Sequence, residues 1–138
     1  MKGLSLILAW GMSSFLLAPL LLAPPMMASV PNGEWLSHVP EKDRVRVNPL
    51  LSDPNAPAAG AKLFHNDCAT CHGAAAEGRG SRPTLRSDRV RHATDGELEW
   101  LLKNGNLAHG MPSWSRLPEA QRWQIVRYLH ALPVEEHE

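Results

Sequence analysis

The chain has 138 residues, and its 14 Lys and Arg residues balance 14 Asp and Glu residues. This balance argues against a protein that binds nucleic acid through its charge, because such proteins carry a basic surplus. A content of 43% hydrophobic and 20% charged residues excludes a wholly disordered chain. The length predicts one domain with appendages.

The N-terminal segment has the pattern of an export signal. Lys2 precedes a nearly uninterrupted apolar run over Leu4–Ala23, and small residues follow at Ala28 and Ser29. We therefore expect residues 1–28 to be a signal peptide and the mature protein to be periplasmic. A run of about 20 apolar residues also spans a bilayer. An uncleaved inner-membrane anchor is thus the alternative, and a membrane association is expected only in that case.

The rest of the chain divides into three parts. Residues 29–56 combine four prolines with many charges, which predicts an extended arm with little regular structure. Residues 57–133 carry helical patterns and no alternating strand pattern, so the predicted fold class is all-α, in one domain. Residues 134–138 form an acidic tail.

Three helices are expected in the central part. The first covers residues 57–67 and starts at a proline, which is favoured in a first turn. The second begins with a capping box made by Thr94 and Glu97 and ends at Gly105. The third covers residues 118–132. Its buried stripe is predicted at Ile125, Tyr128, Leu129 and Leu132, with Val126 beside it.

The two cysteines of the chain stand in the pentapeptide Cys68-Ala69-Thr70-Cys71-His72. In a C-x-x-C-H motif both thiols add to the vinyl groups of a haem, and the imidazole of the histidine binds the iron. We therefore predict one haem c, held by Cys68 and Cys71, with His72 as an axial ligand. A thioredoxin-type pair would follow a strand, and a structural zinc site would need further ligands at a recognisable spacing. The sequence offers neither pattern.

Met111 is the predicted second axial ligand. The other four methionines lie in or beside the leader, so Met111 is the one expected in the mature chain. It stands between Gly110 and Pro112 in a predicted loop, where a methionine that merely fills a core is the weaker explanation. His109 is the rival and would give an iron with two histidine ligands. The remaining histidines are expected at the surface: His38, His65, His92, His130 and His137.

Several short motifs together resemble the class I cytochrome c family, and in particular its small bacterial monohaem members. They cover roughly residues 56–133: Gly60 and Phe64, the C-x-x-C-H motif, Pro83, Gly110-Met111-Pro112, and Tyr128-Leu129. The resemblance implies an all-helical fold around one haem, with the first and last helices crossing near Gly60 and Tyr128. It also implies that the carbonyl of Pro83 accepts a hydrogen bond from His72, and that Trp114 packs near the ligand loop or serves ordinary packing.

The expected coordination indicates electron transfer. An iron with two protein ligands has no open position for a substrate, but it can still change its oxidation state. We therefore expect an electron carrier and not an enzyme, acting between redox partners such as a periplasmic dehydrogenase and a terminal oxidase. Two alternatives stay open. One is a haem enzyme or ligand sensor with a labile Met111, and the other is a fixed cytochrome subunit of a larger oxidoreductase, docked through residues 29–56.

A cluster of arginines follows the haem motif, at Arg79, Arg82, Arg86, Arg89 and Arg91. One interpretation is a solvated loop with an arginine near the haem propionates. The other is a docking patch for an acidic partner, which would speed encounter at low salt.

Overall fold

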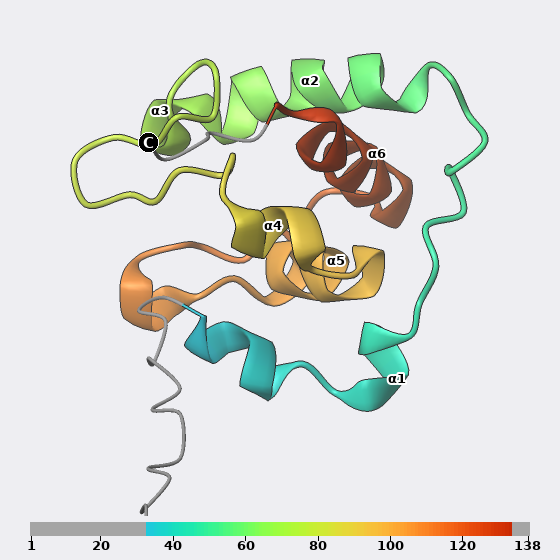
Figure 1. Ribbon diagram of the computed structural model, residues 1–138, viewed down its shortest axis with the longest axis horizontal. Coiled ribbons are helices and arrows are strands. Elements are labelled where there is room, and N and C mark those ends of the chain that lie inside the picture. Colours follow the sequence, from blue (N-terminus) through green and yellow to red (C-terminus); the bar gives the residue numbers. More distant parts are fainter. Residues whose placement is uncertain (1–32, 134–138) are drawn as a thin grey trace, which may run out of the picture.

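Helix α6 (Glu119–Ala131) lies between helix α2 (Ala56–Asp67) and helix α5 (Asp95–Asn104), and it contacts both. Figure 1 shows this arrangement in a computed structural model that describes residues 33–133. The shorter helical elements are η1 (Glu34–His38), α1 (Glu41–Arg44), α3 (Ala69–His72), α4 (Asp88–His92) and η2 (Leu107–His109). The predicted leader and acidic tail lie outside the described residues.

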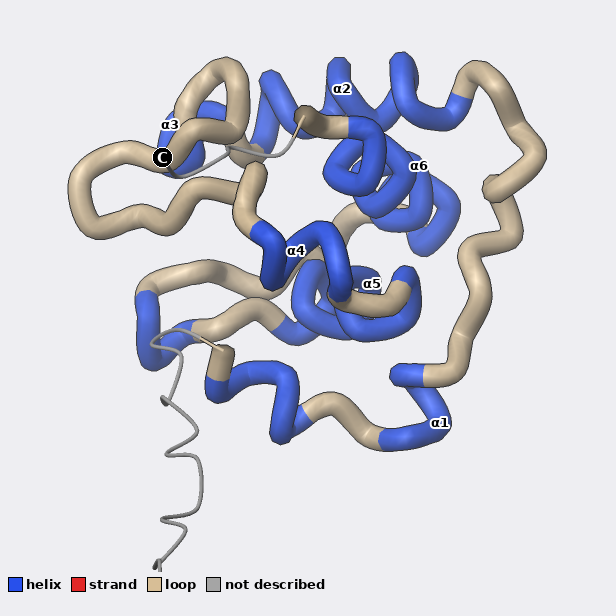
Figure 2. The backbone as a smooth tube through the Cα atoms, viewed as in Figure 1, coloured by secondary structure: helices blue, strands red, loops and turns tan. Residues whose placement is uncertain are grey.

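Within residues 33–133 the regular structure is helical, apart from two isolated β-bridges, which confirms the all-α prediction (Figure 2). The three predicted helices form with nearly the predicted bounds. At the start of α5 the Thr94 hydroxyl accepts from the backbone N–H of Glu97, and the Glu97 carboxylate accepts from that of Thr94, so the capping box is complete. Helix α5 ends before Gly105, whose φ of 74° suits a residue without a Cβ.

The contact between α2 and α6 depends on Gly60. A Cβ at this position would overlap the backbone carbonyl of Gln124, so the two helix backbones touch here. One turn further along α2, the fully buried Phe64 packs against Tyr128 with 5.2 Å between the ring centroids. The close approach of these helices, implied by the resemblance, is therefore present.

The core face of α6 is broader than predicted. Ile125, Val126 and Leu129 are buried as expected, while Tyr128 and Leu132 are half-buried. Two further residues of α6 are buried without having been predicted, Trp123 and Arg122. None of the helices described is both long and apolar enough to cross a membrane.

Residues 33–55 have little regular structure, as expected, but they do not form an extended arm. This segment contains η1 and α1, and it buries Trp35, Val39 and Asn48 against the rest of the molecule. The physical reason is specific pairing: the side-chain amide of Asn48 donates to the carbonyl of Trp123 at 2.9 Å. Arg44 also forms an ion pair with Glu97. Prolines spaced through the segment limit its helices to short pieces but do not prevent it from packing.

Candidate haem site

A cavity of about 360 Å³ lies between the haem-motif turn, α5, α6 and the loop that carries Met111. Its wall includes five of the residues singled out from the sequence: Cys68, Cys71, His72, Pro83 and Met111. The rest of the wall is mainly apolar and includes Phe64, Leu98, Leu102, Ile125 and Leu129. Residues that are far apart in the sequence thus meet around one mainly apolar space.

The C-x-x-C-H motif forms a single helical turn at the end of α2. The backbone N–H groups of Cys71 and His72 both donate to the carbonyl of Cys68, at 3.1 Å and 3.0 Å. This turn brings Cys68, Cys71 and His72 to the cavity wall. Gly73 then ends the turn with a φ of 84°, a conformation that L side chains rarely adopt.

The two thiols differ in environment. Cys68 is buried and Cys71 is exposed, and they form no disulfide. Burial, together with the neighbouring Asp67 carboxylate, raises the pKa of the Cys68 thiol to about 12. Redox-active cysteine pairs need a lowered thiol pKa, because the thiolate is the reactive form. A raised value is the opposite of what the attacking thiol of such a pair needs.

The ring of His72 is positioned by the loop that carries Pro83. Its Nδ1 lies 3.1 Å from the carbonyl oxygen of Pro83, at hydrogen-bonding distance. With Nδ1 as the donor, the other ring nitrogen, Nε2, keeps its lone pair free for a metal. Proline has no backbone N–H, so this residue offers only an acceptor at that place.

Met111 is fixed by a tight loop. Asn106 and Met111 exchange two backbone hydrogen bonds of 2.9 Å and 3.0 Å, which close the loop around η2. Gly110 takes the left-handed conformation with a φ of 75°. The loop therefore presents Met111 to the cavity from a backbone with little freedom. His109, the rival ligand, also lies at the cavity wall, but its Nδ1 is 3.0 Å from the side-chain oxygen of Asn106.

Arg82 links the two sides of the site. Its Nη1 donates to the carbonyl of His109 at 2.8 Å, and a Cβ on Gly110 would lie 2.7 Å from the same nitrogen. Because Pro83 is the next residue, one short segment contacts both His72 and the Met111 loop. The sequence singled out Arg82 as part of a cluster, but it gave no indication of this link.

Trp35 lines the cavity from a segment in which the sequence suggested no cavity residue. It comes from η1, it is 8% exposed, and it lines the same space as Met111 and His72. The segment around it was expected to be extended, so no apolar face was sought there. The spacing of Trp35 and Val39, which are both buried, was the available signal.

Comparison with known proteins identifies the family. Residues 55–129, more than half of the chain, match the family described as "Cytochrome C oxidase, cbb3-type, subunit III". The chain belongs to this family of c-type cytochromes. The cytochrome is also 36% identical over 64 residues to "Cbb3-type cytochrome c oxidase subunit CcoP" of Rubrivivax gelatinosus, a match that covers 46% of this chain and 21% of that relative. The cytochrome thus spans about a fifth of the length of this curated relative.

A solved structure of a c-type cytochrome has a similar fold. Cytochrome cL from Methylophaga aminisulfidivorans superposes with a TM-score of 0.55 at 25% identity, over 63% of this chain and 59% of that chain. The c-type cytochrome XoxG from Methylobacterium extorquens AM1 gives a TM-score of 0.49 at 21% identity, over 60% of this chain and 59% of that one. The likeness to cytochrome cL agrees with the family match.

Family and fold together mean that the cytochrome binds haem c covalently. The residues present fit this group. The cavity has a mainly apolar wall, two thiols and an imidazole on one helical turn, and a thioether from the Met111 loop. These are the side chains that covalent haem attachment and iron ligation require.

Proposed function

We propose that the chain is a periplasmic carrier of single electrons, in which Cys68 and Cys71 hold the haem and His72 and Met111 bind its iron. The observation that supports this proposal most directly is the shared cavity: the motif turn and the Met111 loop reach the same apolar space. The haem supplies the Fe(II)/Fe(III) couple. The apolar residues of the wall would exclude water, and His72 and Met111 would bind the iron.

Each side of the site has its own task under this proposal. The Pro83 carbonyl, 3.1 Å from Nδ1 of His72, orients the imidazole and raises its basicity. The thioether of Met111 favours the ferrous state and raises the potential relative to a second histidine. The apolar wall acts in the same direction, because it disfavours the extra charge of ferric iron.

The test compares two variants of Met111 in the purified haem protein. Met111→Ala should lose the weak far-red absorption band of a methionine bound to ferric haem, lower the potential, and bind carbon monoxide in the reduced state. Met111→His is the matched control, because it keeps two protein ligands. It should stay closed to carbon monoxide and still have a lower potential. Rapid carbon monoxide binding by the unmutated protein would contradict the carrier and favour the enzyme or sensor alternative.

The arginine cluster is part of the proposed carrier function as a docking patch for an acidic redox partner. Arg79 and Arg91 are exposed and flank the loop that carries Pro83. Oxidation of the reduced protein by hexacyanoferrate(III), an anionic probe, should be slower in Arg79→Gln/Arg91→Gln and depend less on salt. Lys62→Gln, an exposed change on α2, is the control and should leave the rate nearly unchanged. Equal rates for all three proteins at low salt would contradict the patch.

A second candidate is a cytochrome subunit of an oxidase. It rests on the family description and on the name of the Rubrivivax relative. Affinity purification from membranes of the native host, at low salt, distinguishes the two candidates. A subunit should be recovered with further chains in fixed proportion, whereas a carrier should be recovered alone.

A further inference from the structure

The segment before the matched family domain is fastened to α5 by charge and by backbone contact. Arg44 pairs with the buried Glu97, and its Nη2 donates to the carbonyl of Leu36 at 2.8 Å. Arg46 pairs at 3.0 Å with Glu99, whose side chain is 1% exposed. A Cβ on Gly96 would overlap the carbonyl of Asp43, so the two backbones touch.

These contacts satisfy buried carboxylates of α5. A buried carboxylate is costly unless it is paired, and Glu97 and Glu99 of this helix each have an arginine partner in the N-terminal segment. Glu99 has a second partner in Arg122 of α6. Residues 33–48 therefore pack against the side of α5 that presents Glu97 and Glu99. The segment lies outside residues 55–129, so the family match does not account for it.

The fastened segment delivers Trp35 to the haem cavity. Within η1, Leu36 directly follows Trp35, and Arg44 donates to the carbonyl of Leu36, so the arginine that pairs with Glu97 also holds the residue next to the indole. Trp35 is 8% exposed and shares the cavity wall with Met111, Leu101 and Leu102. An indole is the largest side chain available for closing such an opening.

We propose that Trp35 forms a wall of the haem pocket, and that the N-terminal segment, held by Arg44 and Arg46, is an integral part of the haem site. This proposal rests on the function proposed above. The wall excludes water and small ligands from the side of the pocket that Met111 occupies. Removing it lets solvent reach the haem, which stabilises the ferric state and lowers the potential.

The experiment uses the full mature haem protein with Trp35→Ala, Trp35→Phe and a control, Trp100→Ala. Trp100 is a half-buried tryptophan of α5 that does not line the cavity. The readouts are the rate at which imidazole binds the ferric protein and the midpoint potential. Trp35→Ala should raise the imidazole rate at least tenfold and lower the potential. Trp35→Phe should stay within about threefold of the unmutated protein, because a ring still fills the opening.

Trp100→Ala should show the unmutated rate and potential. If Trp35→Ala does not fold, Trp35→Leu and Arg44→Gln replace it. The first puts a smaller side chain at the opening, and the second removes the ion pair with Glu97 that holds the segment. Each should give a faster imidazole rate than the unmutated protein. Rates and potentials equal to those of the unmutated protein in every folded variant would overturn the proposal. An unmutated protein without the methionine–iron band would instead contradict ligation by Met111, and the potentials of the Trp35 variants would still test the wall.

Discussion

Helix α6 meets α2 and α5 through opposite kinds of contact. Its contact with α2 is a close approach of the two backbones, because Gly60 of α2 leaves room for the carbonyl of Gln124. Its contact with α5 is an ion pair, in which Nε of Arg122 donates to Glu99 at 2.8 Å and both side chains are almost fully buried. The first contact tolerates no added atom, whereas the second tolerates a change of shape but not the loss of one charge.

The two contacts support different parts of the haem site. Helix α2 leads directly into Cys68, and α5 leads through Gly105 into the Met111 loop. Helix α6 therefore holds both sides of the site at once, one by close packing and the other by paired charges. Each contact can be broken separately, and the expected losses decrease in the order below.

The largest loss is expected for Gly60→Val. The added side chain would enter the backbone of α6, and relief requires the helices to separate. We expect a cost above about 3 kcal/mol in the free energy of unfolding, which is at or beyond the upper end for overpacking. Urea unfolding of the haem protein, followed by circular dichroism, measures it. Ala58→Val is the control on the exposed face of α2, and it should cost less than about 1 kcal/mol.

Arg122→Met should come next, at about 3 kcal/mol, because it leaves Glu99 buried with one remaining partner, Arg46. The same urea unfolding applies. The double variant Arg122→Met/Glu99→Leu sharpens the comparison, since it removes both charges and fills the space with apolar atoms. It should recover part of the loss. A double variant no more stable than Arg122→Met would mean that shape and not charge governs this contact.

Arg46→Gln should cost about 1 kcal/mol, because the side chain of Arg46 is 33% exposed and water compensates for part of the lost pairing. Glu99 keeps Arg122 in this variant. The loss should shrink further at high salt, where the outer pair of Arg46 with Glu119 is screened in the unmutated protein. An equal cost at low and high salt would show that only the buried pair contributes.

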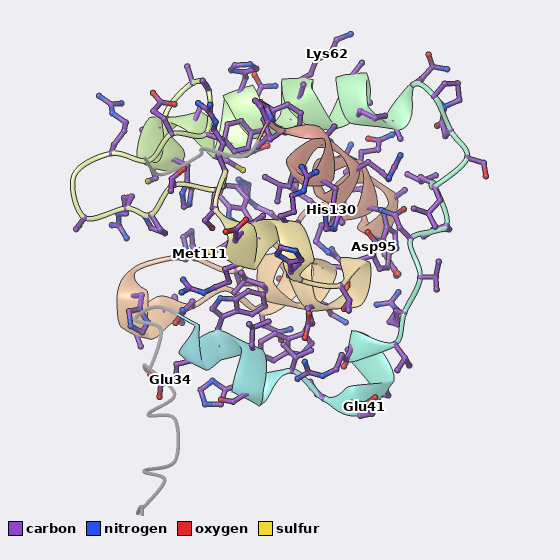
Figure 3. The ribbon with its side chains drawn as sticks, in the orientation of Figure 1. Glu34, Glu41, Lys62, Asp95, Met111 and His130 are labelled. Carbon is purple, nitrogen blue, oxygen red and sulfur yellow. The ribbon has the colours of Figure 1, made fainter. Side chains whose placement is uncertain are left out.

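The smallest effect concerns His130, which contacts Asp95 across α5 and α6 at 3.3 Å (Figure 3). Burial lowers the pKa of His130 below its ordinary 6.5, and Arg127 and Arg91 add to this, while the Asp95 carboxylate opposes it. The unfolded chain therefore takes up the proton first. Stability from this group is fully present above about pH 6.5 and is lost as the pH falls through the lowered folded-state value. His130→Gln should lose less stability between pH 7 and pH 5, roughly neutral to mildly acidic conditions, in thermal unfolding.

Sequence patterns predicted what depends on neighbours in the chain. The capping box of Thr94 and Glu97 spans four residues and the C-x-x-C-H motif five, so both can be recognised without knowledge of the fold. The three long helices follow from spacing and from their terminal signals. The site residues could be proposed because they stand in short motifs: a cysteine pair before a histidine, and a methionine between glycine and proline.

What depends on distant partners was missed. Arg122 and Glu99 have the composition of a solvated surface, and their burial is explained only by each other and by Arg46. The packing of residues 33–56 was missed for the same reason, since its arginines pair with carboxylates more than 50 positions away. The place of Trp35 in the haem cavity was missed as a consequence. Prolines and charges in a segment thus predict short helices, and they do not predict solvent exposure.

The crossing of α2 and α6 also bears on how fast the molecule forms. It joins positions 60 and 124, and both the haem-motif turn and the Met111 loop lie within the loop that it closes. The entropy lost on closing a loop grows only slowly with its length, by about 0.6 kcal/mol for each doubling, whereas contacts distant in sequence slow the search. Insertions in the exposed stretch around Gly80 should therefore leave the equilibrium nearly unchanged and delay the moment at which the pocket closes.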